Sequence, residues 1–136
     1  MIALRRLSLL FGLACGTAFA ADVAKITPTD AAKLVAAGSA VLVDVREPAE
    51  WAESGVAAPA VLLPKSAFDA EQAGDWKSFL EKNRGKEIIL YCRSGRRSGA
   101  VAAVLAEHGY NVANAGGFKD WSAAGLPTRK VSAEKP

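Results

Sequence analysis

The chain is poor in the side chains that bind metals or form disulfides. Its 136 residues include two cysteines, one histidine and one methionine. A structural metal site draws on about four cysteine, histidine or acidic ligands, and a disulfide framework needs several paired cysteines. We therefore expect no bound metal and no cofactor. Apolar residues make up 51% of the chain and charged residues 23%, which is typical of one globular domain with its own hydrophobic core.

The chain also lacks an apolar run long enough to cross a membrane. Arg5 and Arg6 precede an apolar stretch of about 14 residues, whereas a membrane-spanning helix needs ~20. The stretch ends in Ala18-Phe19-Ala20, a small-x-small cleavage pattern. We predict a secretory signal peptide over residues 1–20, export to the periplasm, and no membrane attachment after cleavage. A membrane anchor and a lipid anchor at Cys15 are the alternatives.

A large excess of positive charge is missing once the signal peptide is removed. Arg5 and Arg6 leave with it, so Lys plus Arg falls from 17 to 15 against 14 acidic residues, and the formal net charge falls from +3 to +1. The remaining basic residues are scattered, apart from the cluster Arg93, Arg96 and Arg97. This pattern does not supply the basic stripe of a nucleic-acid-binding protein, and we expect no nucleic-acid partner.

Hydrophobic patterning predicts strands that alternate with helices. The predicted strands are 40–45, 61–63, 87–91 and 111–113, and the predicted helical segments are 28–37, 47–53, 71–83, a helix ending at Gly109, and 118–124. Such alternation implies right-handed crossovers and a mainly parallel sheet with helices on both faces, which is an α/β fold. We predict a single domain over residues 21–128 and a flexible tail over 129–136.

One loop combines a favourable position with unusual composition. The segment Cys92-Arg93-Ser94-Gly95-Arg96-Arg97 joins a predicted buried strand to a predicted helix. In open α/β sheets, ligands bind at the carboxyl ends of the strands, where such loops lie. The first N–H groups of a helix have no intrahelical partner and converge on anions, and Gly95 permits the backbone bend that this requires. We expect this loop, including the backbone of Ser94 and Gly95, to bind an anion.

Cys92 is the single thiol that remains after signal cleavage. It is a buried inert residue, an intermolecular disulfide partner or a reactive group. A thiol at a helix N-terminus beside arginines has a pKa below the free value of about 8.5. Since cations are unfavourable at that end of a helix, the three arginines also indicate a bound anion. We predict a reactive Cys92 thiolate, with Arg97 as anion ligand or loop brace and Arg93 and Arg96 as anion ligands. This hypothesis requires loop amides that face the sulfur and a sulfur that is not sealed from solvent.

Three motifs, in this order, resemble the rhodanese domain and specifically its small single-domain exported members. They are Asp44-Val45-Arg46-Glu47 with Glu50, the loop from Cys92 to Ser98, and Ala115-Gly116-Gly117-Phe118-Lys119-Asp120-Trp121 followed by Gly125-Leu126-Pro127. The resemblance runs from about Ile26 to Pro127. It implies a five-stranded parallel sheet, a catalytic cysteine that carries a persulfide, and thiosulfate as the sulfur donor.

The resemblance implies a thiosulfate sulfurtransferase, in which Cys92 takes the outer sulfur of thiosulfate and passes it to cyanide or a thiol. We expect the protein to be a monomer. The basic loop favours an inorganic dianion over mercaptopyruvate as the donor. A persulfide carrier fed by a protein donor, or a redox sensor, is the alternative. A phosphatase is the weaker alternative, because tyrosine phosphatases place one residue more between cysteine and arginine than the four that separate Cys92 from Arg97.

The other motifs predict supporting roles. Asp44 and Arg46 are expected to form a structural ion pair beside the site. Glu50 either braces an arginine of the loop through a bidentate contact or lies on a solvated helix face. The chain departs from the family pattern at Gly55-Val56-Ala57-Ala58-Pro59-Ala60, where the family usually has a Gly-His-Ile-x-Gly-Ala-like stretch. This departure bears on how the loop over 56–59 packs.

Overall fold

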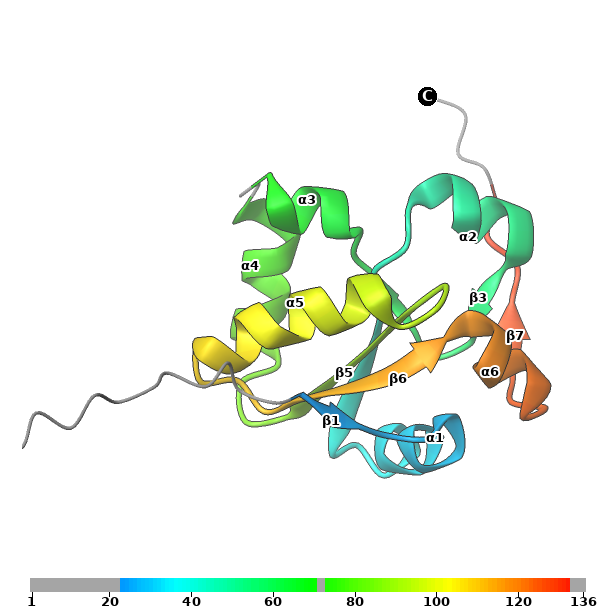
Figure 1. Ribbon diagram of the computed structural model, residues 1–136, viewed down its shortest axis with the longest axis horizontal. Coiled ribbons are helices and arrows are strands. Elements are labelled where there is room, and N and C mark those ends of the chain that lie inside the picture. The colour runs from blue at the N-terminus through cyan, green and yellow to red at the C-terminus, as the bar shows by residue number, and fades with distance from the viewer. Residues whose placement is uncertain (1–22, 71–72, 133–136) are drawn as a thin grey trace, which may run out of the picture.

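The computed structural model describes residues 23–70 and 73–132, so the predicted signal peptide lies outside the described residues. Five parallel strands form one sheet in the order β1-β6-β5-β2-β4 (Figure 1). They are β1 (Ala24–Lys25), β2 (Ala40–Asp44), β4 (Val61–Leu62), β5 (Glu87–Cys92) and β6 (Val112–Gly117). This confirms the predicted α/β class with a five-stranded parallel sheet.

Helices cover both faces of this sheet, as predicted (Figure 1). One face carries α3 (Lys65–Asp69), α4 (Ala73–Lys82) and α5 (Arg96–Glu107), and the other carries α1 (Pro28–Ala36) and α6 (Phe118–Ala123). Helix α2 (Pro48–Ser54) lies near a small antiparallel pair of strands, β3 (Val56–Ala57) and β7 (Thr128–Arg129). The loops that follow β2, β5 and β6 therefore meet at one edge of the sheet.

The central strand β5 divides its side chains between two hydrophobic clusters. Ile88, Leu90 and Cys92 belong to the cluster under α4 and α5, whereas Ile89 and Tyr91 belong to the cluster under α1 and α6. Successive side chains of a strand point to opposite faces, which explains this division. Each large apolar side chain buried in this way contributes about 1.5–3 kcal/mol before the entropy of ordering is subtracted. The alternation also places the Cys92 side chain on the face that α5 covers.

The short elements differ from the prediction. Helix α3 and the two-residue strands β1, β3 and β7 are absent from the prediction. A strand of two residues carries no periodicity, and β3 pairs with a segment about 70 positions further along the chain. Strand β6 extends to Gly117 instead of ending at residue 113. Of the predicted helix 71–83, the part from Ala73 to Lys82 is observed, and residues 71–72 lie outside the described part.

The segment predicted as a tail begins at Arg129, which the structure places in a strand. Arg129 belongs to β7, and its guanidinium donates hydrogen bonds to the carbonyl oxygens of Ala58 and Ala60 at 3.2 and 2.9 Å. Gly55 makes this approach feasible, because a Cβ there would lie 2.7 Å from the Arg129 oxygen. The departure from the family pattern after Gly55 thus packs as a buried strand held by the chain's carboxyl-terminal part, of which residues 133–136 lie outside the described residues.

Candidate active site

The loop after β5 folds back over the sulfur of Cys92. Cys92 ends β5 and α5 begins at Arg96, so three residues make the turn. Gly95 has φ = 93°, a left-handed conformation that favours glycine, and its N–H donates to Cys92 Sγ at 3.0 Å. A loop amide therefore faces the sulfur, as the anion-cradle hypothesis requires.

Hydrogen bonds from the loop stabilise the thiolate form of Cys92. Burial alone would raise the pKa of this thiol, because it removes the charged form from water. Hydrogen bonds from the Ser98 hydroxyl and from the amides of Ser98, Ser94 and Gly95 outweigh burial, so the pKa of Cys92 lies below its ordinary value. The predicted direction of the shift is confirmed, and its main stabilising cause is hydrogen bonding rather than the arginines.

The loop arginines have three different placements. Arg97 donates to both carboxylate oxygens of Glu50, at 2.6 and 2.9 Å, so of the two alternatives for Glu50 the structure shows the bidentate brace of the loop. This interaction raises the pKa of Arg97 and lowers that of Glu50, so both stay charged.

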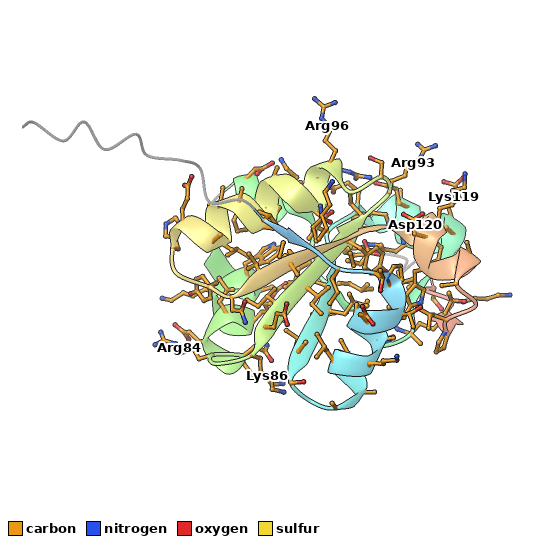
Figure 2. All side chains as sticks on the ribbon, turned by 60° about the horizontal axis from the view of Figure 1, so that its bottom comes forward. Arg84, Lys86, Arg93, Arg96, Lys119 and Asp120 are labelled. Carbon is orange, nitrogen blue, oxygen red and sulfur yellow. The ribbon has the colours of Figure 1, made fainter. Side chains whose placement is uncertain are left out.

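Arg96 points into solvent, and Arg93 is exposed on the same side of the molecule as Lys119 (Figure 2). Arg93 lines a cavity beside the loop.

Cys92 is fully buried, with 0% of its surface exposed. The requirement that the sulfur be open to solvent is therefore not met in this conformation, because the loop itself covers the sulfur. A cavity of about 640 Å³ nonetheless begins at the next two residues, Arg93 and Ser94. A substrate that approaches from this cavity has to displace part of the loop to reach Sγ.

The lowered pKa leads to a prediction about reactivity. We expect the rate of Cys92 alkylation by iodoacetamide to rise with pH around a midpoint below the free-thiol value of about 8.5. Ser98→Ala removes a hydroxyl 3.4 Å from Sγ and should move this midpoint upward. Alkylation rates measured by mass spectrometry between about pH 5 and 10 test this expectation, because this range covers both sides of the free-thiol pKa of about 8.5. A midpoint at or above that of a free thiol would contradict it.

The covered sulfur leads to a second prediction. Iodoacetamide should react with native Cys92 faster than a bulky maleimide does, after each rate is divided by its rate for the protein unfolded in urea. The reason is that a small reagent needs a smaller displacement of the loop. Equal protection against both reagents would indicate that exposure of the sulfur requires unfolding of a much larger region.

Asn114 on β6 holds the loop in place, a role that the sequence motifs do not predict. Its Nδ2 donates to the Gly95 carbonyl oxygen at 2.8 Å, and its Oδ1 accepts from Ser98 Oγ at 2.8 Å and from Gly116 N at 3.0 Å. Since a hydroxyl has one proton, Ser98 donates either to Asn114 or to Cys92 Sγ at a given moment. The signal for this role in the sequence is the polar side chain of Asn114 among the small and apolar residues of β6.

The paired glycines of the third motif allow β6 to approach the loop. A Cβ at Gly117 would lie 2.2 Å from the Arg93 carbonyl oxygen, and a Cβ at Gly95 would lie 3.2 Å from Gly116 Cα. Cys92 and Gly117 are also partners in the register of β5 and β6. The motif therefore supplies close backbone packing behind the loop that follows β5.

Asp44 and Arg46 form the predicted structural ion pair. Both side chains are buried, and Arg46 Nη2 donates to Asp44 Oδ2 at 2.8 Å while Nε bonds both carboxylate oxygens. Burial opposes the charge on Arg46, but the hydrogen bonds and charge of Asp44 outweigh it and raise the pKa of Arg46. The guanidinium also lies over the ring of Phe118, 4.5 Å from its centroid. The pair thereby ties the end of β2 to the start of α6.

Residues 23–70 and 73–132 contain no group of three or more histidine, cysteine or acidic side chains arranged to hold a metal ion. Over the same residues, no helix has both the length and the apolar character needed to cross a lipid bilayer.

The loop, its thiolate-stabilising amides and the parallel sheet define a rhodanese-type site, and comparison with known proteins gives the same result. The family model of the rhodanese-like domain matches residues 27–124. The chain therefore belongs to the rhodanese-like domain family. Homologues at moderate identity are sulfurtransferases, so the chain is a member of a sulfurtransferase family.

Two relatives and one solved structure show the range of similarity. A thiosulfate sulfurtransferase of Actinobacillus succinogenes is 32% identical over 114 residues, which are 82% of this chain and 96% of that protein. An uncharacterised protein of Synechocystis is 35% identical over 78% of this chain, and the match spans 56% of its length. The polysulfide-sulfur transferase homodimer of Wolinella succinogenes has a TM-score of 0.66 at 27% identity, over 85% of this chain and 84% of that one.

Proposed function

We propose that this protein is an exported thiosulfate sulfurtransferase that acts in the periplasm through a persulfide on Cys92. The observation that carries the proposal is the hydrogen bond from the Gly95 amide to Cys92 Sγ at 3.0 Å. It lies at the N-terminus of α5 and beside a cavity. The sulfurtransferase relatives support this class of reaction. Export rests on the signal-peptide pattern of residues 1–20.

In the first half-reaction, the Cys92 thiolate attacks the outer sulfur of thiosulfate. A bond forms between Sγ and that sulfur, the S–S bond of thiosulfate breaks, and sulfite leaves with the electron pair. No general base is needed, because hydrogen bonds from the loop already favour the ionised thiol. A thiolate and a dianion repel each other, by about 4 kcal/mol per pair of unit charges at 4 Å and an effective dielectric of 20. The loop amides and Arg93 offset this repulsion.

In the second half-reaction, a nucleophilic acceptor attacks the outer sulfur of the persulfide. Cyanide gives thiocyanate and a thiolate gives a new persulfide, and in both cases the Cys92 thiolate is the leaving group. The same amides that face the thiolate in this structure are placed to hold the negative outer sulfur between the two steps. The site thus returns to its starting state without an oxidant or a reductant.

Mass spectrometry of the protein treated with thiosulfate tests the proposal. We expect a gain of one sulfur atom on Cys92, and its loss on addition of cyanide with formation of thiocyanate. A protein that gains no sulfur from thiosulfate but accepts it from a persulfidated protein would instead be a sulfur carrier. Amino-terminal sequencing of the protein from the periplasmic fraction tests export, with Ala21 expected as the first residue.

A further inference from the structure

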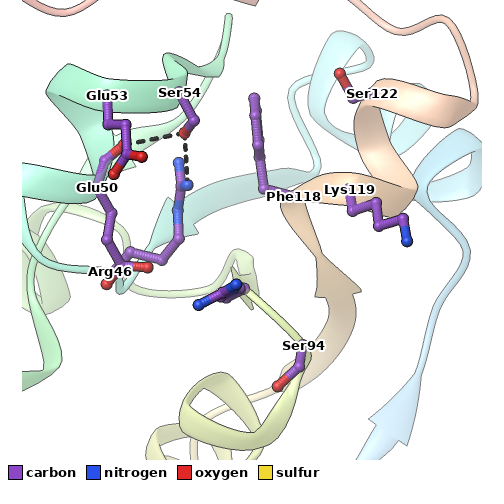
Figure 3. Close-up of a pocket in the computed structure, with 9 residues that line it drawn as sticks. Arg46, Glu50, Glu53, Ser54, Ser94, Phe118, Lys119 and Ser122 are labelled. Carbon is purple, nitrogen blue, oxygen red and sulfur yellow. Dashed lines mark hydrogen bonds between the residues drawn. The ribbon is translucent and has the colours of Figure 1, made fainter.

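Helix α2 separates two cavities. Glu50, Glu53 and Ser54 line the cavity beside the Cys92 loop (Figure 3). A second cavity, of about 630 Å³, lies between the opposite side of α2 and the chain that continues from β7 (Figure 1). Cavities of roughly 300–1,000 Å³ hold organic ligands of moderate size. We call this second cavity the α2 groove, and it is lined by Pro48, Ala49, Trp51, Ala52, Leu62 and residues 129–132.

The α2 groove combines apolar walls with positive charge. Trp51, Leu62 and Val131 contribute apolar surface, and Arg129 and Lys130 contribute two cations. Among the described residues that line the groove, none carries a carboxylate. Within residues 23–70 and 73–132, no ion pair engages either cation, and Arg129 donates its hydrogen bonds to neutral carbonyl oxygens. The groove therefore complements an anion that carries an apolar body.

The indole of Trp51 adds a hydrogen-bond donor that has no acceptor. Trp51 is 8% exposed, and its Nε1 is the one buried side-chain nitrogen or oxygen without a partner in the part of the chain that the structure describes. In contrast, Nε1 of Trp76 donates to the Pro64 carbonyl oxygen at 3.1 Å, and Nε1 of Trp121 donates to that of Pro127 at 2.9 Å. Buried polar groups are nearly always hydrogen-bonded, so an unpartnered donor in the wall of a groove points to a ligand that supplies the acceptor.

A ligand reaches this donor only when a residue of the groove moves, because Nε1 is covered in this conformation. Residues 130–132 line the groove and lie outside any helix or strand. Their displacement breaks no hydrogen bond of a helix or of the sheets, so it costs less free energy than opening of the core.

We propose that the α2 groove binds a fatty acid of medium chain length. Its carboxylate would accept a hydrogen bond from Trp51 Nε1 and pair with Lys130, and its alkyl chain would pack against Leu62 and Val131. A peptide is a poorer occupant, because its backbone N–H and C=O groups need partners and Ser132 is the uncharged polar side chain among the described lining residues. This site takes no part in sulfur transfer at Cys92, so the inference stands apart from the proposed function.

Nuclear magnetic resonance of the indole N–H groups tests the site directly. Isotope-labelled protein gives one such signal for each of its three tryptophans, and Trp51→Phe identifies the Trp51 signal by its loss. Octanoate is the probe. It should move the Trp51 signal to lower field, as a new hydrogen bond to a carboxylate does. The signals of Trp76 and Trp121 should stay in place, because those N–H groups already have acceptors.

Ligands that share one part of octanoate show which part is recognised. Octanol and octylamine have the same chain without the negative charge, and acetate has the carboxylate without the chain. The dipeptide N-acetyl-alanyl-leucine has a carboxylate and an apolar end but also carries peptide groups. Each of these should bind more weakly than octanoate in isothermal titration calorimetry.

Variants of the groove separate the donor from the charge. Lys130→Gln should weaken octanoate binding by about two- to fivefold, as expected for an exposed charge pair, and leave octanol binding unchanged. Trp51→Phe keeps a ring in the wall but removes the donor, and should weaken octanoate binding by about tenfold. Lys86→Gln changes an exposed cation away from the groove and is the matched control.

A pair of variants at Ala52 tests the charge requirement and leaves the donor and both cations intact. Ala52→Asp and Ala52→Asn place side chains of the same size at an exposed position of the groove wall. Ala52→Asp should weaken octanoate binding more than Ala52→Asn does, because a carboxylate in the wall repels the carboxylate of the ligand.

Three results would overturn the inference. Octanoate that moves none of the indole signals, or all three alike, would show that the unpartnered donor is not part of a binding site. Octanol or octylamine that binds as tightly as octanoate would show that the groove does not select a carboxylate. Tighter binding of the dipeptide than of octanoate would show that the occupant is a peptide.

Discussion

Replacement of Cys92 by serine is expected to lower sulfur transfer from thiosulfate to cyanide by about 10³-fold or more. The loop stabilises an anion on the sulfur through hydrogen bonds, but a serine hydroxyl stays protonated at neutral pH and cannot form a persulfide. Thiocyanate formation measures the activity. The matched control is Cys92→Ala, which should show the same residual activity, since both variants lack the nucleophile.

The interpretation requires that the serine variant folds. Its urea unfolding midpoint should stay close to that of the parent protein, because serine is similar in size to cysteine and retains a hydrogen-bond acceptor for the Gly95 amide. A folded Cys92→Ser variant that retained a large part of the activity would show that the persulfide forms elsewhere, and the assignment of the site would be wrong.

Replacement of Arg46 by leucine is expected to reduce the free energy of unfolding by about 3–5 kcal/mol. Asp44 and Arg46 are both buried, so removal of the arginine leaves the Asp44 carboxylate without a counter-charge and without three of its hydrogen bonds. Urea unfolding followed by tryptophan fluorescence measures the change. In contrast, Lys65→Leu removes an ion pair with Asp69 at the surface and should cost less than about 1 kcal/mol.

A double variant separates the loss of an ion pair from the loss of packing. Asp44→Leu combined with Arg46→Leu removes both charges, and should therefore be more stable than Arg46→Leu alone. If the double variant were less stable than the single one, the contacts that Asp44 keeps in Arg46→Leu, such as the hydrogen bond its Oδ1 accepts from the backbone N–H of residue 46, would matter more than the missing counter-charge.

Local sequence patterns predicted the scaffold and the centre of the site. The apolar run that precedes Cys92 predicted a buried strand, and the glycine and arginines that follow it predicted an anion-binding turn. The pairing of Asp44 with Arg46 was predictable because two residues on one strand end cannot lie far apart. The contact between Glu50 and Arg97 was one of two open alternatives, because it joins segments 47 positions apart.

Other features depend on contacts between distant segments and have no local pattern. Strands β3 and β7 have two residues each, so they form only where the fold brings Val56 opposite Arg129. Asn114 supports the loop that follows Cys92 only because β6 lies beside β5 in the sheet order. The cavity near Cys92 combines α2 and α6, which the sequence alone could not bring together.

By itself, the sequence determined the α/β class, the parallel sheet, and the place of Cys92 between a strand and a helix. Periodicity, turn residues and helix-terminus electrostatics act over a few neighbouring residues, so these features can be derived from the chain directly. Only the tertiary structure decided that the sulfur is covered, that Arg97 braces the loop while Arg93 faces the cavity, and that Glu53 and Lys119 line it together. These properties are set by the packing of segments far apart in the chain, where side-chain direction and burial are fixed jointly by all the elements in contact.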